Sequence, residues 1–199
     1  MKTIIVGGFL GSGKTTVLIQ FARFLVKRTS SEIRVAILEN EIGEVGIDNT
    51  LIGGSGFAVR NLFGGCVCCT VSGELTTAVS KIRDELNPEW LIVETTGLAF
   101  PKSMVENLSE ALGIFARVCI VADAARWARL FLPMNALLCG QIEGANTVLI
   151  NKTDLAVDIE RVENDIREIE PLAEIYRISA SAELAERVFV SILGEEKQL

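Results

Sequence analysis

The chain has 199 residues, of which 49% are hydrophobic and 23% charged, a composition typical of a packed globular protein. Its formal net charge of −7 argues against a broad nucleic-acid-binding surface, which would need clustered lysine and arginine. The mean hydropathy is +0.39, but no run reaches the roughly 18 uncharged apolar residues that a membrane-spanning helix requires, so we expect a cytoplasmic protein without a membrane partner.

Short apolar runs alternate with longer helical patterns along the chain, and no linker divides residues 1–199 into two domains. Strands are expected at 3–8, 33–40, 57–62, 90–96, 117–124, 147–152 and 174–179. Helices are expected at 14–28, 72–86, 103–113, 133–144, 158–170 and 181–193. The alternation predicts a single α/β domain with a mostly parallel sheet and helices on both faces, in which ligands bind beyond the carboxyl ends of the strands.

The first strand runs into GFLGSGKT at 8–15, which has the spacing of a phosphate-binding loop that joins a strand to a helix. Glycines let the backbone turn its N–H groups toward phosphate oxygens, and the helix N-terminus adds partial positive charge. Lys14 would reach the β- and γ-phosphates, and the Thr15 hydroxyl would bind magnesium. The nucleotide-binding candidates here are Gly8, Gly11, Ser12, Gly13, Lys14, Thr15 and Thr16. The loop predicts a fold of the P-loop NTPase type.

The segment LFGGCVCCT at 62–70 places Cys66, Cys68 and Cys69 within four residues of a chain that has five cysteines and no histidine. Three thiolates suit zinc or copper(I), and zinc takes a fourth ligand to complete a tetrahedron. That ligand would be water, a carboxylate or a partner's group, and such an incomplete site suits metal transfer. Two alternatives remain: the cysteines are small buried apolar residues, or they are redox-active thiols.

The strand at 90–96 lies in LIVETTGL at 91–98, where Glu94 and Gly97 occupy positions that fit a γ-phosphate sensor. Glu94 would bind magnesium directly or through water, although most GTPases have aspartate at this point. A backbone N–H of Gly97 would face the γ-phosphate. The catalytic set is then Lys14, Thr15 and Glu94, and since no water-orienting residue is evident, we expect slow hydrolysis. The alternative is an ordinary strand end.

The strand at 147–152 ends in NKTD, which resembles the base-recognition motif of GTPases. Asp154 would accept hydrogen bonds from guanine N1–H and its 2-amino group, a pair of donors that adenine lacks. Asn151 would bond the base edge and steady the loop, and the aliphatic stem of Lys152 would lie along the base. In RISAS at 177–181, the backbone N–H of Ala180 would reach the guanine oxygen. An exposed turn is the alternative reading of NKTD.

The motifs GGFLGSGKTT, ENEIGEVGID at 39–48, GGCVCCT at 64–70, ETTG and NKTD occur in the order seen in the CobW-like GTPases. The whole chain resembles the GTPase half of a CobW-like metallochaperone. This resemblance implies a GTP- and GDP-binding, magnesium-dependent protein that delivers zinc, or cobalt or nickel, to a client metalloprotein or cobalamin-related enzyme. It also implies Glu39 and Glu44 as carboxylate ligands near the cysteines. Longer members carry a C-terminal domain, which we expect to be absent here.

The cysteine loop lies between 39–48 and 94–97, the two segments expected to sense the γ-phosphate. GTP would then change metal affinity, and metal would change GTP affinity by the same factor. A homodimer or the client would complete the hydrolytic site. Two other classes stay open. One is a GTP-gated redox sensor or binding module without metal delivery, and the other is a small-molecule kinase, against which NKTD weighs.

Overall fold

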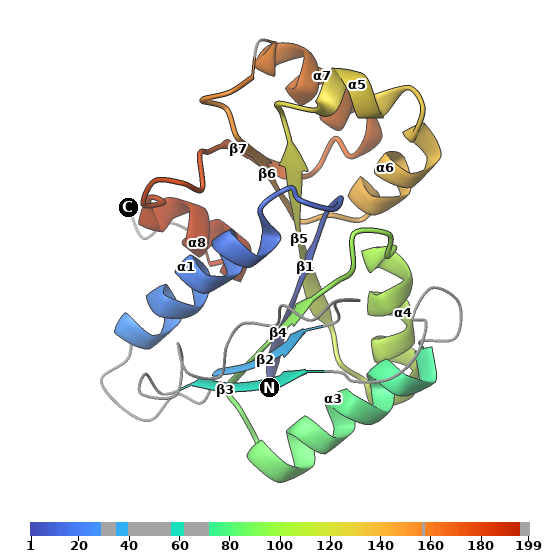
Figure 1. The fold of residues 1–199 in the computed structure, drawn as a ribbon. Coiled ribbons are helices and arrows are strands. Elements are labelled where there is room, and N and C mark those ends of the chain that lie inside the picture. Colours follow the sequence, from blue (N-terminus) through green and yellow to red (C-terminus); the bar gives the residue numbers. More distant parts are fainter. Residues whose placement is uncertain (29–34, 40–56, 62–71, 157, 196–199) are drawn as a thin grey trace.

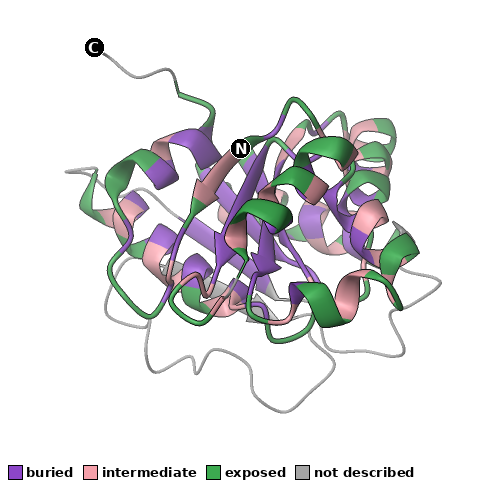
Figure 2. Ribbon diagram, turned by 90° about the horizontal axis from the view of Figure 1, so that it is seen from above, coloured by how far each residue is buried: buried purple, intermediate pink, exposed green. Residues whose placement is uncertain are grey.

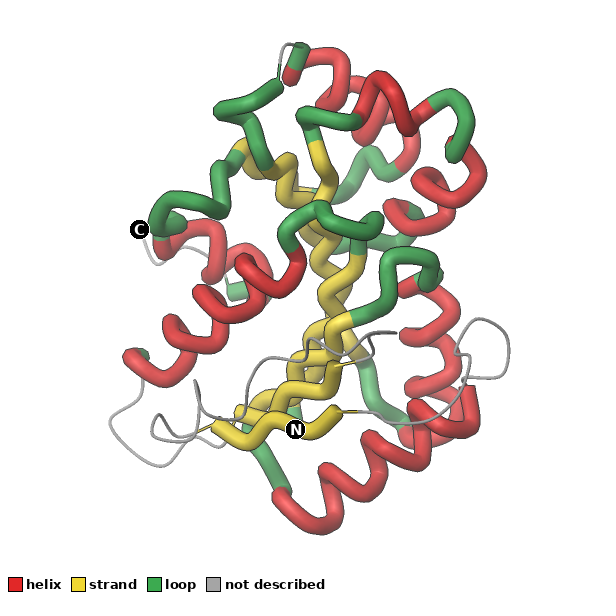
Figure 3. The backbone as a smooth tube through the Cα atoms, viewed as in Figure 1, coloured by secondary structure: helices red, strands yellow, loops and turns green. Residues whose placement is uncertain are grey.

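The computed structural model describes residues 1–28, 35–39, 57–61, 72–156 and 158–195, and Figure 1 presents the fold. Its strands are β1 (Lys2–Gly7), β2 (Val35–Glu39), β3 (Phe57–Asn61), β4 (Trp90–Glu94), β5 (Ala116–Asp123), β6 (Thr147–Asn151) and β7 (Glu174–Arg177). Its helices are α1 (Lys14–Lys27), α3 (Ser72–Leu86), α4 (Pro101–Leu112), α5 (Trp127–Phe131), α6 (Asn135–Ile142), α7 (Ile159–Ile169) and α8 (Glu186–Leu193). Most of the described strands are followed in the chain by a helix, as the sequence predicts, and Figure 3 shows the strands at the centre with helices around them.

The seven described strands form one sheet in the order β3-β2-β4-β1-β5-β6-β7, and every neighbouring pair is parallel. β1 lies at the centre, with Val6 opposite Glu94 of β4 and Cys119 of β5. Because all strands run the same way, their carboxyl ends share one edge of the sheet, where ligands bind in this architecture. The predicted parallel α/β sheet is confirmed.

Helices cover both faces of the sheet, as predicted (Figures 1 and 2). In β1 the side chain of Ile5 packs toward α3, α4, α6 and α7, whereas Ile4 and Val6 pack toward α1 and α8. This alternation follows from the two-residue period of a strand. The burial of β4 and β6 along their whole lengths explains why their sequences are apolar throughout.

Helices α1 and α8 pack together on one face of the sheet. Phe189 of α8 packs against Phe21 and Phe24 of α1, with ring-centroid distances of 5.9 and 4.9 Å. The carboxyl edge of the sheet therefore lies between two packed layers of helices.

No helix in the described ranges combines the length and hydrophobicity needed to cross a bilayer.

The structure differs from the sequence prediction in the start of the last helix and in one additional short helix. The last helix was expected from residue 181, but α8 begins at Glu186, because residues 179–184 form a loop in which Ala182 N–H bonds the carbonyl of Ser179. The short helix α5 was not predicted, since its five residues are too few to display a helical period.

Candidate nucleotide-binding site

The glycine-rich loop joins β1 to α1 at the carboxyl edge of the sheet. Gly8, Gly11 and Gly13 all have positive φ, at 135°, 70° and 102°. At Gly13, the residue that precedes α1, a side chain would also collide with the carboxamide of Asn151. Both the backbone conformation and the space therefore require glycine there. The loop has the backbone form that turns N–H groups toward an anion.

The first turn of α1 carries the two polar side chains that the loop motif predicts. Lys14 is the first helical residue and is only 8% exposed. The hydroxyl of Thr15 donates to Oε1 of Glu94 over 2.8 Å, although the two residues are 79 positions apart. Glu94 is itself buried at the end of β4. The structure therefore brings Thr15 and Glu94, two of the three predicted catalytic residues, into contact, and Lys14 directly precedes Thr15 in α1.

Gly97 lies directly against the glycine-rich loop, because a side chain at this position would meet the backbone of Leu10 at 2.6 Å. The segment is held from the other side by the buried Gln141 of α6. The Nε2 atom of Gln141 donates to the carbonyls of Gly97 and Ala99 over 2.9 and 3.3 Å. The predicted γ-phosphate segment is therefore fixed between the loop and α6.

Asn151 links the phosphate loop to the loop after β7. Its Nδ2 donates to the carbonyl of Ser12 over 2.8 Å, and its Oδ1 accepts the N–H of Ala180 over 2.8 Å. These two hydrogen bonds are of the kind that the predicted steadying role of Asn151 would need. The Ala180 N–H already has a partner within the chain, so a guanine oxygen would share this donor or meet a neighbouring one.

Lys152 and Arg126 both bind the buried carboxylate of Asp123. Their Nζ and Nε atoms lie 2.6 and 2.7 Å from its Oδ2. Each cation also donates to the phosphate loop, Lys152 to the Gly11 carbonyl over 2.6 Å and Arg126 to the Leu10 carbonyl over 2.5 Å. Burial alone would raise the pKa of Asp123, but hydrogen bonds and charge from Lys152 and Arg126 outweigh it and lower that pKa.

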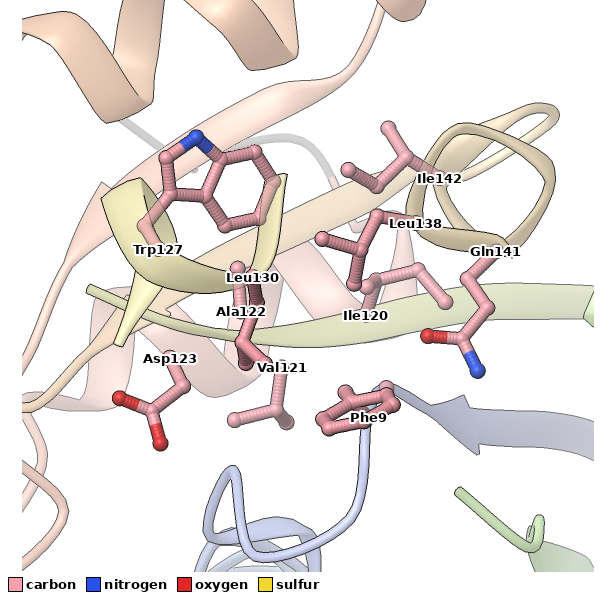
Figure 4. A pocket seen from close by; sticks show the side chains of 11 residues that line it. Phe9, Ile120, Val121, Ala122, Asp123, Trp127, Leu130, Leu138, Gln141 and Ile142 are labelled. Carbon is pink, nitrogen blue, oxygen red and sulfur yellow. The ribbon is translucent and has the colours of Figure 1, made fainter. Parts of the chain in front are cut away.

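A small cavity of about 10 Å³ lies between Phe9, the end of β5, α5 and α6 (Figure 4). It has room for about one water molecule. In Figure 4 the carboxylate of Asp123 and the carboxamide of Gln141 lie at opposite ends of this mostly apolar cluster. The cavity is too small for a nucleotide, so the candidate nucleotide site is the surface formed by the loop and the strand ends.

The remaining predicted nucleotide residues lie around this surface. Ser12 is fully buried, and its hydroxyl has no hydrogen-bond partner among the described residues, whereas Thr16 is exposed on α1. Asp154 is exposed two residues beyond Lys152, which adopts a left-handed backbone conformation with φ of 63°. An exposed carboxylate at this point is accessible to a ligand.

The predicted metal ligands Cys66, Cys68, Cys69 and Glu44 lie outside the described residues. Glu39 is described only through its backbone, which pairs with Glu94 of β4, a neighbour of β2 in the sheet. In the described part of the chain, no three cysteine, histidine or acidic residues gather as a metal site.

The two described cysteines are poor candidates for metal ligands. Cys119 of β5 is buried, and burial raises the pKa of its thiol to about 12, with Arg117 only partly opposing this. Burial, together with the charges of Glu143 and Asp165, also raises the pKa of Cys139 on α6. Both are therefore thiols at neutral pH, the form that binds metal poorly.

Sequence reasoning missed four residues that organise the site: Gln20, Asp123, Arg126 and Gln141. Asp123 had a usable signal, because it is a carboxylate at the end of an apolar strand run. The other three have none, since each is a polar residue that suits an exposed surface equally well. The backbone partners of the two glutamines lie 42 to 164 residues away in the chain, and Leu10, the partner of Arg126, lies 116 residues away.

The central strand of the parallel sheet enters a glycine-rich loop, and Lys14 opens the helix that follows. Thr15 lies against a carboxylate from the neighbouring strand. This arrangement defines a P-loop NTPase. The family described as "CobW/HypB/UreG, nucleotide-binding domain" matches residues 2–177, and the chain belongs to this family. The family resemblance inferred from the motifs is confirmed.

Curated relatives include metallochaperones. The chain is 30% identical over 182 residues to "Zinc chaperone YjiA" of Escherichia coli, covering 86% of this chain and 55% of the relative. It is 27% identical over 221 residues to "Zinc-regulated GTPase metalloprotein activator 1" of Dictyostelium discoideum, covering 89% and 45%. The chain thus spans about half the length of these relatives.

Solved structures share the fold. The zinc-bound YjiA GTPase from E. coli gives a TM-score of 0.67 at 20% identity, covering 98% of this chain and 62% of the other. Nickel-bound HypB from Helicobacter pylori gives 0.66 at 17% identity, covering 98% and 84%. At these identities the likeness supports the P-loop NTPase fold alone.

Proposed function

We propose that this chain binds GTP and GDP with magnesium, hydrolyses GTP slowly, and couples its nucleotide state to the delivery of zinc or another transition metal from the CxCC loop to a client metalloprotein. The observation that carries the nucleotide part is the position of Asn151, which joins the phosphate loop at Ser12 to the loop at Ala180. A base-recognition segment tied to a phosphate loop is the arrangement that a nucleoside triphosphate requires.

Guanine selectivity is assigned to Asp154. The left-handed backbone at Lys152 turns the chain just before this carboxylate, which is exposed to solvent. It would accept hydrogen bonds from guanine N1–H and the 2-amino group. Adenine offers neither donor in that arrangement, so a bound adenine would leave the carboxylate without its partners.

The residues present fit a magnesium ion. Mg²⁺ prefers six oxygen ligands at 2.0–2.1 Å, so two adjacent ligands lie about 2.9 Å apart. The oxygens of Thr15 and Glu94 are separated by 2.8 Å. Bound magnesium would supply charge neutralisation at the β- and γ-phosphates. Lys14 would bind the same phosphates, and Glu94 would orient the Thr15 hydroxyl.

The metal cargo is assigned to Cys66, Cys68 and Cys69, with Glu39 and Glu44 as candidate carboxylate ligands. Support comes from the relatives named zinc chaperones and from the chain's CxCC pattern. Three thiolates and a carboxylate or water make a ligand set that zinc accepts. The absent fourth cysteine or histidine would let the ion leave for a client.

The register of the sheet supports coupling between metal and nucleotide. Glu39 of β2 pairs with Glu94 on one side and with Asn61 of β3 on the other. Neighbouring strands lie about 4.8 Å apart, so Asn61 is on the order of 10 Å from Glu94. Asn61 is the last residue of β3 and precedes Cys66 by five residues in the sequence. Both proposed ligand segments thus follow strand ends that lie within about 10 Å of the backbone of Glu94.

Calorimetry with GDP, GTP and ATP tests the nucleotide assignment. We expect GTP and GDP to bind much more tightly than ATP, and Asp154→Asn to shift the preference toward xanthine nucleotides, whose 2-oxo group accepts from an amide. Lys14→Ala should abolish nucleotide binding in a folded chain. Equal affinities for ATP and GTP in the wild type would rule out this assignment.

A zinc titration against a chelating competitor tests the cargo assignment. Replacing any two of Cys66, Cys68 and Cys69 by alanine should reduce zinc affinity steeply while GTP binding persists. Cys139→Ala is the matched control, because it removes a thiol outside the loop. Unchanged zinc affinity in the triple variant would return the loop to the redox-sensor alternative.

The same titration in the presence of GDP and of a non-hydrolysable GTP analogue tests the coupling. Coupling of the usual size would change zinc affinity by about 5- to 150-fold between the two nucleotides. Superimposable curves, with no effect of zinc on the GTPase rate, would mean two independent sites.

A further inference from the structure

The side-chain carboxamide of Gln20 on α1 bonds the loop that follows β7 through both its nitrogen and its oxygen. Its Nε2 donates to the carbonyls of Ala180 and Ala182 over 2.9 and 3.0 Å. Its Oε1 accepts the N–H of Leu184 over 2.9 Å. One side chain from the helix that follows the phosphate loop therefore ties down three backbone groups about 160 residues later in the chain.

These contacts determine how the loop presents its backbone N–H groups. A peptide unit is planar, and its C=O and N–H point in opposite directions. Gln20 holds the carbonyl of Ala180 toward α1, so it also fixes the direction of the Ser181 N–H in the same peptide unit. Asn151 holds the N–H of Ala180 in the preceding peptide unit. Two carboxamides thus orient two consecutive peptide units.

We propose that Gln20 is a positioning residue for guanine recognition, which orients the N–H of Ser181 toward the 6-oxo group of the base, while the N–H of Ala180 stays bonded to Asn151. This inference rests on the proposed guanine-nucleotide function. It assigns the reading of the 2-amino group to Asp154 and the reading of the 6-oxo group to a loop whose geometry depends on Gln20. The two ends of the base are then read by two different loops, which Asn151 joins through the N–H of Ala180.

The position of Gln20 favours this role over simple packing. It is half-buried at a hollow of about 480 Å³ between α1 and residues 181–189, which Arg23 also lines. If Gln20 only filled space beside this hollow, any side chain of similar size would do the same. What distinguishes glutamine is that it offers two donors to carbonyls and one acceptor to an N–H, the set that this loop presents.

The test uses two replacements and one control. Gln20→Ala removes the side chain, whereas Gln20→Glu keeps its shape and its acceptor but loses both donors. Arg23→Ala is the control, because it alters the same face of α1 about one turn away. Among the described residues, no hydrogen bond joins Arg23 to the loop at 179–184. Each variant is titrated by calorimetry with GDP, 6-thio-GDP and IDP. 6-Thio-GDP replaces the 6-oxo group by a larger, weaker acceptor, and IDP lacks the 2-amino group.

We expect the wild type and Arg23→Ala to bind GDP more tightly than 6-thio-GDP. In Gln20→Ala and Gln20→Glu the GDP to 6-thio-GDP affinity ratio should fall by about two- to tenfold, the range of a single neutral hydrogen bond. The GDP to IDP ratio should stay within about twofold of the wild-type ratio, because Asp154 is untouched. That unchanged ratio also verifies that the variants are folded at the base site.

Three results would overturn the role of Gln20. The first is equal binding of GDP and 6-thio-GDP by the wild type, and the second is a GDP to 6-thio-GDP affinity ratio that neither replacement changes. The third is a Gln20→Glu variant that behaves as the wild type, which would indicate that the side chain only packs. The wild type is also titrated with ADP, and equal binding of GDP and ADP would instead overturn the proposed guanine function. The two failures are therefore distinguishable.

Discussion

Replacing Asp123 by asparagine removes the charge that holds Lys152 and Arg126 against the phosphate loop. Asparagine keeps one acceptor, so the 3.1 Å bond from the Arg126 backbone N–H can persist. The two bonds to Oδ2 from charged donors are lost, each ordinarily contributing about 1.5–3 kcal/mol. Both cationic side chains are 30% exposed and regain some hydration. We therefore expect the free energy of unfolding to fall by about 2–4 kcal/mol at pH 7.

The loss should depend on pH with a definite sign. The pKa of Asp123 in the folded chain lies below its ordinary value of 3.8. A carboxylate with a lowered pKa contributes stability that is complete above the ordinary pKa and disappears as the pH falls through the folded-state pKa. The difference between wild type and Asp123→Asn should therefore be constant from pH 7 to about pH 5 and shrink below about pH 4.

Urea unfolding at pH 7, 5 and 3.5, followed by circular dichroism, measures this difference. Asp84→Asn is a matched control, because its carboxylate is 64% exposed and we expect a change below about 0.5 kcal/mol. An Asp123→Asn variant as stable as Asp84→Asn at pH 7 would refute the reasoning. So would a destabilisation that grows as the pH is lowered.

Gly13→Ala should abolish GDP binding in calorimetry and lower stability by at least about 1–2 kcal/mol, because φ is 102° and the new methyl group would collide with Asn151. Gln141→Leu should lower the free energy of unfolding by about 1–3 kcal/mol in urea, since two carbonyls of 97–99 lose their donor. In native alkylation followed by peptide mapping, Cys119 should stay unmodified at pH 8 while partly exposed Cys139 reacts, because Cys119 is buried with a pKa of about 12. Rapid alkylation of Cys119 would contradict its burial. An unchanged stability of Gln141→Leu would contradict the importance of its two hydrogen bonds, and GDP binding by Gly13→Ala would contradict the requirement for glycine in the loop.

Local sequence determined much of the fold and the phosphate site. The spacing of GFLGSGKT after a strand predicts the loop and the start of α1 at Lys14, because it depends only on neighbouring residues. Apolar runs predict buried strands, and the structure confirms β1, β4 and β6 as buried. The ends of helices also have local signals, such as Asp158, whose side chain accepts the N–H of Arg161 at the start of α7.

Only the tertiary structure decided which distant groups meet. Periodicity says that a strand is buried but not which strands flank it, so the order β3-β2-β4-β1-β5-β6-β7 is not readable from the sequence. Gln20 and Gln141 look like ordinary polar helix residues, because a hydrogen bond to a backbone group leaves no pattern in the partner's sequence. The contact of Thr15 with Glu94 exists because parallel pairing of β1 and β4 brings their carboxyl ends together across 79 residues. The sequence by itself therefore determined the parts of the site, and long-range strand pairing determined their arrangement.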